Sequence, residues 1–398
     1  MDFGLSDKIL KYKHEAREWV ENVLNPLSQP LEEEEKLPEE LVEQLRKGRF
    51  FGLTIPKEYG GEGWSAVEWF TVLEELAKAY ATIRLIAHTM NGLFWRPILH
   101  FGTDEQKKKY LPKLATGEIW AANSLTEPEA GTGKDINSRA EKDGADYVLN
   151  GQKWLITLFP GYTKLIYAFA ATEEGITSFL VDVPREGLIL KPMQKMMGCV
   201  GPRHFNVIYK NCRVPASRVL GEKGNGLDVA FGMLHLSRVS IAFCCVGLAQ
   251  KMLDLAVDYA KNRSTFGKRL AKRQAVQNNI AQMGTEIQAA RLLAYEAAWK
   301  FDQGQEIIKE AAMAKLLAEQ VITRVSEMAL RIHGGIGYTK AYPLERHFRD
   351  ARSFHFEEGT EEIQKLLISR YMLNRDLFVC SRIQCFTFDD GVGLSDGL

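Results

Sequence analysis

Apolar residues recur with helical spacing in the first third of the chain. The pattern begins after Ser65, which together with Glu68 forms the capping-box sequence that opens many helices. An amphipathic helix is therefore expected here, within a mostly helical segment over residues 1–120. The apolar positions that repeat are Trp69, Val72, Leu73, Leu76 and Tyr80.

Around Trp120 the pattern changes to short runs of β-branched and aromatic residues. Gly, Pro and Asp separate these runs, and no helical stretch lies between them. Short strands without intervening helices favour an antiparallel sheet over a parallel α/β sheet. We therefore predict a central β domain over residues 121–225, with strands near 147–150, 165–171, 177–183 and 205–209.

From about Gly226 the helical spacing returns in longer stretches. One apolar stripe lies between residues 248 and 259, and another lies between residues 313 and 332. Two adjacent glycines, Gly334 and Gly335, interrupt the pattern before the last helices. A helical bundle is therefore expected over residues 226–373. The tail over residues 374–398 shows no clear period, and no function is assigned to it.

Charge and composition narrow the function classes. The chain has 398 residues, and its 51 basic side chains balance its 51 acidic ones, which argues against a nonspecific nucleic-acid or anionic-membrane binder. No uncharged apolar stretch reaches the roughly 18 residues of a membrane span, and no signal-peptide core precedes the first helix. The six cysteines show no metal-ligand spacing, so we expect reduced thiols, no metal and a cytoplasmic protein.

Two segments place hydroxyl groups beside glycine. Thr126 and Thr132 lie on a Gly/Pro loop at the start of the β domain, where their hydroxyls could bind a flavin edge or a phosphate, although turn formation alone is the alternative. Arg263 and Lys268 flank two hydroxyls and Phe266 at a predicted helix end. That set suits a pyrophosphate, and it suits a solvated helix terminus equally well.

Two further segments surround the last helices. The adjacent glycines noted above could let the backbone approach a ligand closely, or could form a tight interhelical turn. Glu358 lies between the aromatic residues Phe354 and Phe356 and a Gly-Thr helix start. Aromatic surroundings would desolvate this carboxylate and favour a general base that acts near neutral pH. The alternative is an exposed surface pair formed by Glu357 and Glu358.

Taken in order and spacing, these segments resemble the acyl-CoA dehydrogenase family over about residues 1–373. The resemblance implies a mostly α fold with a helical N-terminal domain, a central antiparallel β-barrel or sandwich and a C-terminal four-helix bundle. It also implies a homotetramer with non-covalent FAD at a subunit interface. The segments that carry it include Tyr59-Gly60-Gly61-x-Gly63, Leu125-Thr126-Glu127-Pro128, Arg263-x-x-Phe266-Gly267, Gly334-Gly335-x-Gly337 and Glu358-Gly359-Thr360.

The implied reaction is the α,β-dehydrogenation of an acyl-CoA thioester to the trans-2-enoyl-CoA. Glu358 would take the α-proton while the β-hydride passes to flavin N5, and an electron-transfer flavoprotein would accept the electrons. Some branches of the family place the base on an earlier helix, but Ser237 stands at that position here. The implied location is the cytoplasm of a prokaryote, or the mitochondrial matrix of a eukaryote.

The resemblance also assigns binding roles by position. Thr126 and Thr157 would contact the isoalloxazine ring, and Thr360 would contact the cofactor. Thr132, Arg238 and Gly359 would bind the substrate. The pyrophosphate and adenosine of FAD would be held across the subunit interface by Arg263, Phe266, Gln274, Gly334 and Gly335.

Arg84 and Leu155 differ from the residues that are usual in the acyl-CoA dehydrogenase family. Glutaryl-CoA dehydrogenases carry an Arg at the position of Arg84, where it pairs with the distal carboxylate of the substrate. A buried Arg84 would favour a dicarboxylic acyl-CoA such as glutaryl-CoA through a bidentate pair, whereas a solvent-facing Arg84 would not. Leu155 replaces the Trp that normally flanks the flavin, and Trp154 precedes it. This puts the shielding of the flavin in question.

Three alternatives remain open at this stage. An acyl-CoA oxidase or a flavin monooxygenase could share the fold, although such oxidases are usually longer and such monooxygenases lack the equivalent of Glu358. A non-catalytic member could bind FAD and a macromolecule such as DNA. The neutral charge balance and the presence of Glu358 argue against that last alternative.

Overall fold

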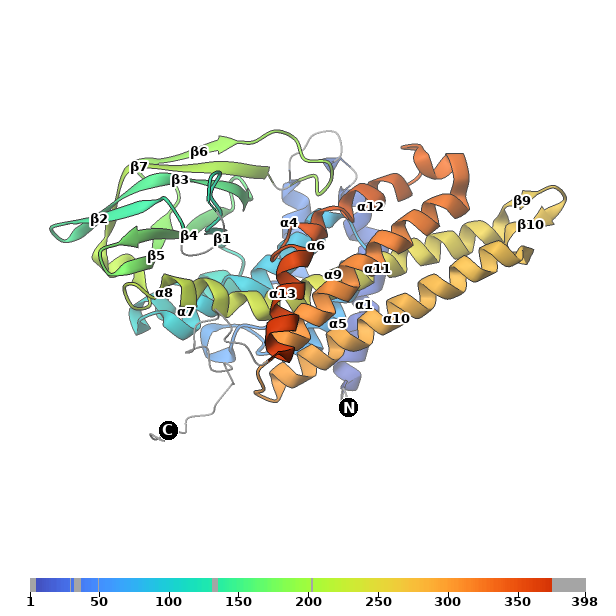
Figure 1. Ribbon diagram of the computed structural model, residues 1–398, viewed down its shortest axis with the longest axis horizontal. Coiled ribbons are helices and arrows are strands. Elements are labelled where there is room, and N and C mark those ends of the chain that lie inside the picture. Colours follow the sequence, from blue (N-terminus) through green and yellow to red (C-terminus); the bar gives the residue numbers. More distant parts are fainter. Residues whose placement is uncertain are drawn as a thin grey trace.

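A computed structural model describes residues 5–28, 30–31, 37–48, 50–130, 135–201 and 203–373. The predicted tail, 374–398, and Thr132 lie outside these described residues. Helices of the N-terminal segment pack beside a sheet at one end of the molecule and beside a long helical bundle at the other (Figure 1). The chain order is therefore helices, sheet, helices, as predicted.

The N-terminal helices form one core with the C-terminal bundle. The predicted capping box is present, because Ser65 Oγ accepts from the Glu68 amide at 3.2 Å and Glu68 Oε2 accepts from the Ser65 amide at 2.9 Å. The described elements are α1 (Asp7–Trp19), η1 (Val20–Leu24), α2 (Asn25–Ser28), α4 (Glu39–Lys47), η2 (Lys57–Tyr59), α5 (Ala66–Leu76), α6 (Ala81–Ala87), η3 (His88–Leu93), α7 (Arg96–Phe101) and α8 (Asp104–Ala115).

Helix α5 differs from the amphipathic helix predicted for it. Ten of its eleven residues are buried, because α1, α9 and α10 all pack against it. Tyr80 does not continue its stripe; it is the N-terminal cap of α6. A helix that is covered on several sides has few polar residues on any face. The apolar spacing therefore located this helix in the sequence but did not reveal that it is buried.

The central sheet has eight strands within the described residues, in the order β6-β7-β3-β2-β4-β5-β8, with β1 paired to β4. All four predicted runs lie in strands of this sheet. Most pairings are antiparallel, as predicted, but β1 and one residue of β2 pair with β4 in parallel. The strands are β1 (Trp120–Ser124), β2 (Arg139–Asp143), β3 (Asp146–Leu158), β4 (Thr163–Thr172), β5 (Gly175–Asp182), β6 (Leu188–Pro192), β7 (Arg203–Pro215) and β8 (Val219–Leu220).

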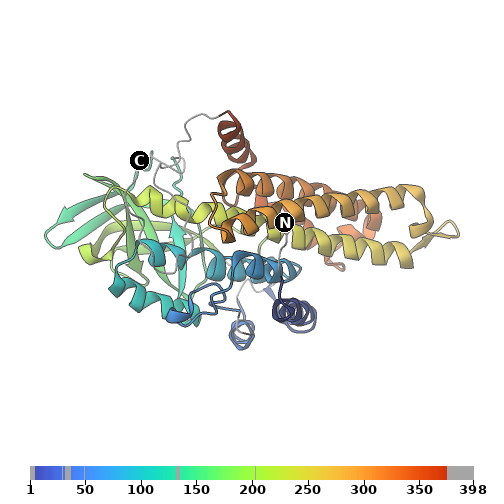
Figure 2. The same ribbon diagram turned by 90° about the horizontal axis from the view of Figure 1, so that it is seen from below.

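The C-terminal bundle consists of long helices with a small hairpin at its far end (Figures 1 and 2). Its longest helix, α9 (Gly226–Asn262), is long and apolar enough to cross a membrane, but 78% of its most apolar stretch is buried against other helices. The remaining elements are β9 (Ser264–Thr265), β10 (Lys268–Arg269), η5 (Leu270–Lys272), α10 (Gln274–Asp302), α11 (Ile308–His333), η6 (Gly334–Tyr338), α12 (Leu344–Asp350), η7 (Ser353–His355) and α13 (Glu361–Met372).

Candidate active site

Glu358 lies on a tight turn between η7 and α13. Its φ angle is +56°, and that of Gly359 is +94°. The left-handed region costs a non-glycine residue about 1–2 kcal/mol, so surrounding contacts must hold the turn. Side chains from three helices donate to its carbonyls. These are Arg238 to Glu358 O at 3.2 Å, Lys315 to Gly359 O at 2.7 Å, and Gln364 to both carbonyls at 3.2 and 3.0 Å.

The Glu358 carboxylate faces a buried histidine. His88 Nε2 lies 3.8 Å from Glu358 Oε1, and His88 Nδ1 lies 2.6 Å from Ser240 Oγ on α9. His88 opens η3, a π-helical segment of the kind that is frequent at functional sites. The Glu358 side chain is 15% exposed, so it is largely enclosed but not fully shielded from solvent. Sequence analysis missed His88, because a single histidine among apolar residues carries no motif.

Arg84 is buried and forms a bidentate ion pair with Glu357. Both nitrogen–oxygen distances are 2.6 Å, and Arg84 is only 2% exposed. Burial raises the pKa of Glu357, but the charge and hydrogen bonds of Arg84 outweigh this and hold that pKa at about 2. The solvent-facing alternative for Arg84 is therefore wrong. The surface-pair alternative is also wrong for Glu357, whose carboxylate is turned toward Arg84.

The predicted aromatic surroundings of Glu358 are only partly present. Phe354 is buried, but its ring packs against Arg84, with the guanidinium carbon 4.4 Å from the ring centre. Phe356 is 76% exposed. The prediction that both rings desolvate Glu358 is therefore wrong for the described chain. The reason is that η7 directs one ring into the core and the next ring outward.

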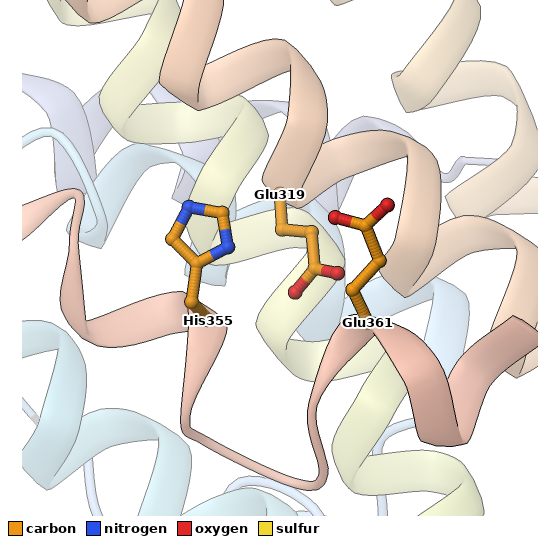
Figure 3. A group of neighbouring side chains, drawn as sticks. All are labelled: Glu319, His355 and Glu361. Atoms are coloured by element: carbon orange, nitrogen blue, oxygen red, sulfur yellow. The ribbon is translucent and has the colours of Figure 1, made fainter.

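A cluster of ionisable side chains lies beside the turn, which joins His355 to Glu361 (Figure 3). Glu319, His355 and Glu361 bring their potential metal-ligand atoms within 4.8 Å of one another. Lys315 already pairs with Glu319 and also donates to the Gly359 carbonyl. The Lys315 ammonium thus supplies the positive charge that a cation would bring. We therefore assign the cluster to holding the turn rather than to metal binding.

The sheet contributes two threonines to the same region. The Trp154 amide donates to the Thr126 carbonyl at 2.8 Å and joins the Thr126 loop to β3. Under this loop, buried Lys153 donates to Glu127 at 2.7 Å and to the Leu125 carbonyl at 3.1 Å. Glu127 also accepts from two backbone amides, at residues 137 and 138. The ion pair therefore fixes the loop that carries Thr126.

A bulge in β3 shapes the surface beside these threonines. The pairing of β3 with β7 is irregular between Lys153 and Ile156, and Leu155 has a φ angle of +56°. As a result, Trp154 and Leu155 both project outward, with exposed fractions of 37% and 42%. The replacement of the family's Trp by Leu155, with Trp154 before it, therefore leaves two exposed apolar side chains at this surface.

His204 is the neighbour of Thr157 in the sheet. Thr157 pairs with His204 across β3 and β7, and the charge of Glu357 acts on the same imidazole, whose pKa burial lowers. Neither the Thr126 hydroxyl nor the Thr157 hydroxyl has a hydrogen bond to another described residue. Two half-buried hydroxyls beside two exposed apolar side chains suit the polar edge and apolar face of a flavin ring.

The other predicted FAD-binding residues gather at the far end of the bundle. Arg263 lies 25 residues beyond Arg238, which corresponds to roughly 37 Å of helix at 1.5 Å per residue. Phe266 is fully exposed in the β9–β10 hairpin there, so the segment after α9 is a hairpin and not only a helix end. A Cβ built on Gly334 or Gly335 would meet no atom within 4 Å, so both backbones are open to a ligand. Gln274 begins α10 at this end.

The predicted substrate and cofactor residues thus form two groups on one chain. Arg238, Gly359 and Thr360 lie at the Glu358 turn, with Thr126 and Thr157 on the sheet side of it. The second group lies at the end of the bundle that carries the β9–β10 hairpin (Figure 1), roughly 37 Å along α9 from Arg238. The structure does not bring the two groups together within one chain.

Comparisons with known proteins identify the family to which the chain belongs. Residues 6–118, 122–212 and 224–373 match the models of the N-terminal, middle and C-terminal domains of acyl-CoA dehydrogenases. A 3-(aryl)acrylate reductase of Clostridium sporogenes is 38% identical over 90% of this chain and 96% of its own length. The CarC subunit of the caffeyl-CoA reductase–Etf complex of Acetobacterium woodii is 37% identical over 90% of this chain and 97% of its own length.

Solved structures show the same three-domain fold. Butyryl-CoA dehydrogenase from Megasphaera elsdenii superposes with a TM-score of 0.89 at 33% identity, over 94% of this chain and 100% of that one. A glutaryl-CoA dehydrogenase from Mycobacterium smegmatis, solved with FADH2, superposes with a TM-score of 0.88 at 26% identity, over 94% and 96% of the two chains. FAD is the cofactor of this group of enzymes, and the paired hydroxyls described above fit it.

Proposed function

We propose that this chain, which belongs to the acyl-CoA dehydrogenase family, uses Glu358 to exchange the α-proton of an acyl-CoA thioester. One observation carries the proposal: the Glu358 carboxylate is held beside His88 on a turn that three helices stabilise. A positioned carboxylate of this kind can act as a general base. Dehydrogenation of the acyl-CoA at its CH–CH bond is the reaction of the family.

The chain's own residues would prepare the proton transfer. Interior donors occupy the carbonyls of Glu358 and Gly359, so the turn cannot relax and the carboxylate keeps its direction. Arg238 lies buried behind the turn, and burial lowers its pKa to about 10, so it remains a cation near neutral pH. FAD, when bound, supplies the acceptor for the β-hydride, and Thr126 and Thr157 would hold its ring edge.

Assembly would complete the cofactor site. Arg263 lies roughly 37 Å along α9 from Arg238, which contacts the Glu358 turn, so a neighbouring copy would bring its hairpin to the Thr126 side of this chain. A homotetramer provides such contacts, and the fully exposed Phe266 is a suitable contact residue. An electron-transfer flavoprotein is the proposed electron acceptor, supported by the Etf complex named for the CarC relative.

The opposite direction of the same reaction is a second candidate. Two relatives at 38% and 37% identity are named reductases. Glu358 would then deliver the proton to the α-carbon rather than remove it. Reoxidation of the reduced holoprotein by a 2-enoyl-CoA, compared with reduction by the saturated thioester, would show which direction is faster.

Replacement of Glu358 tests the role of the base. Glu358→Gln keeps the shape of the side chain and removes the carboxylate, so the holoprotein should stay yellow. The rate at which an acyl-CoA bleaches the flavin should fall by at least about 100-fold. Anaerobic stopped-flow absorbance measures both properties, and Glu118→Gln, an exposed carboxylate at 58%, is the matched control. Undiminished bleaching in Glu358→Gln would place the base elsewhere.

A further inference from the structure

We propose that Glu357 is a specificity residue that occupies Arg84 and thereby excludes acyl-CoAs with a distal carboxylate. The inference rests on the proposed function and deepens it by naming the substrate class. Acyl groups that reach the Arg84–Glu357 pair must be uncharged. This replaces the hypothesis of a dicarboxylic substrate, because the guanidinium that would bind the substrate carboxylate already binds a carboxylate of its own chain.

The position of the pair relative to the base follows from one helix. Arg84 and His88 are four residues apart on the continuous stretch from α6 into η3, so their side chains lie about one turn, roughly 5–6 Å, apart. His88 faces Glu358, and Arg84 faces Glu357. An acyl chain whose α-carbon lies against Glu358 therefore has the ion pair within a few carbon atoms of it.

Exposure places Glu357 in front of Arg84. The Glu357 side chain is 23% exposed, whereas that of Arg84 is 2% exposed. Glu357 is therefore the more accessible member of the pair. The pair is neutral as a whole, and Glu358 adds a further acidic group beside it. A carboxylate on the substrate would have to displace Glu357 and would meet unfavourable charge from both glutamates.

Arg84 is fixed independently of Glu357. Its guanidinium also donates to Ser353 Oγ at 3.0 Å and to Cys199 Sγ at 3.4 Å, and it packs on the ring of Phe354. Ser353 is itself held by a hydrogen bond to the Asp350 carbonyl at 2.9 Å. Neutralising Glu357 should therefore leave a positioned, buried cation without its counter-charge. A buried cation in that state favours any carboxylate that can reach it.

The experiment compares glutaryl-CoA with butyryl-CoA as reductants of the flavin under anaerobic conditions. In the wild type, butyryl-CoA should be preferred by at least about 100-fold, because the distal carboxylate of glutaryl-CoA would lie unpaired beside two glutamates. In Glu357→Gln, that preference should fall by at least about 10-fold, because glutaryl-CoA gains the guanidinium. The double variant Arg84→Gln/Glu357→Gln should restore the wild-type ratio, because the cation is gone.

A comparison that needs no variant uses the amide analogue of glutaryl-CoA, in which a neutral carboxamide replaces the carboxylate. The wild type should accept the amide and discriminate against the acid by at least about 10-fold. Equal bleaching by acid and amide, or an unchanged preference in a folded Glu357→Gln, would overturn the role of Glu357. If no thioester bleaches the flavin of the wild-type holoprotein, the proposed function itself fails, and this inference fails with it.

Discussion

At the scale of single residues, the Arg84–Glu357 pair should make stability depend on acidity. The pKa of Glu357 is about 2 in the folded chain, below the value of about 4.3 expected when unfolded. A carboxyl group with a lowered pKa stabilises the fold above its unfolded pKa, and that contribution is lost as pH falls toward 2. The shift corresponds to roughly 3 kcal/mol, shared with every group to which it is coupled.

Urea unfolding between pH 2 and pH 6 measures this effect. The wild type should lose stability more steeply below about pH 4.3 than Glu357→Gln, which has no carboxylate to protonate. The Glu118→Gln variant serves as a control, because its carboxylate is exposed and contributes little. Parallel stability profiles for the wild type and Glu357→Gln would show that the pair does not stabilise the fold.

Sequence motifs located the turn but not its partners. Glu358, Gly359 and Thr360 form a short local pattern, which a sequence displays directly. Arg84 and Glu357 are 273 positions apart, and no local spacing in the sequence predicts a contact over that separation. The contact between His88 and Glu358 was not predictable for the same reason. A resemblance to known enzymes suggested a role for Arg84. That Arg84 pairs with Glu357 of its own chain could be found only from the packed structure.

At the scale of elements, the buried Lys153–Glu127 pair should decide whether the Thr126 loop keeps its place. Lys153→Met removes the cation and leaves a buried carboxylate with only backbone amide partners, which should cost about 3–5 kcal/mol. The double variant Lys153→Met/Glu127→Gln should recover part of that loss, because no unpaired charge remains. Thermal unfolding measures stability, and the ratio of flavin to protein absorbance reports the cofactor.

The single variants Lys153→Met and Glu127→Gln form, with the double variant, a cycle that isolates the pair. Full additivity of the two single changes would mean that the ion pair contributes nothing of its own. Loss of stability without loss of FAD would separate a role in folding from the proposed role in holding Thr126.

Helices and strands were predictable to different degrees. The stripes between 248 and 259 and between 313 and 332 lie in α9 and α11, because a helix that packs on one side keeps its apolar period. The parallel pairing of β1 with β4 was not predictable, since its register depends on a partner some forty residues away. The bulge at Leu155 also escaped prediction, because leucine gives no sign of a left-handed conformation.

At the scale of the whole molecule, domain order followed from the change of period along the chain, but the placement of the two predicted FAD-binding groups did not. The length of α9 between Arg238 and Arg263 explains why local motifs at Thr126 and at Arg263 could both be correct and still not meet in one chain. In the proposed assembly, a second copy would unite them.

Phe266 provides the test of this proposed assembly. Its side chain is 100% exposed in the single chain and its φ angle is +47°, a conformation that aspartate tolerates better than phenylalanine. Phe266→Asp should therefore leave the stability of the isolated fold within about 0.5 kcal/mol. If the hairpin completes the FAD site of a neighbouring copy, the variant should lose FAD and dissociate, as measured by absorbance and by light scattering after size exclusion. Leu10→Asp, at an exposed apolar position on α1, is the control. Retention of both FAD and the wild-type mass by Phe266→Asp would remove the hairpin from the cofactor site.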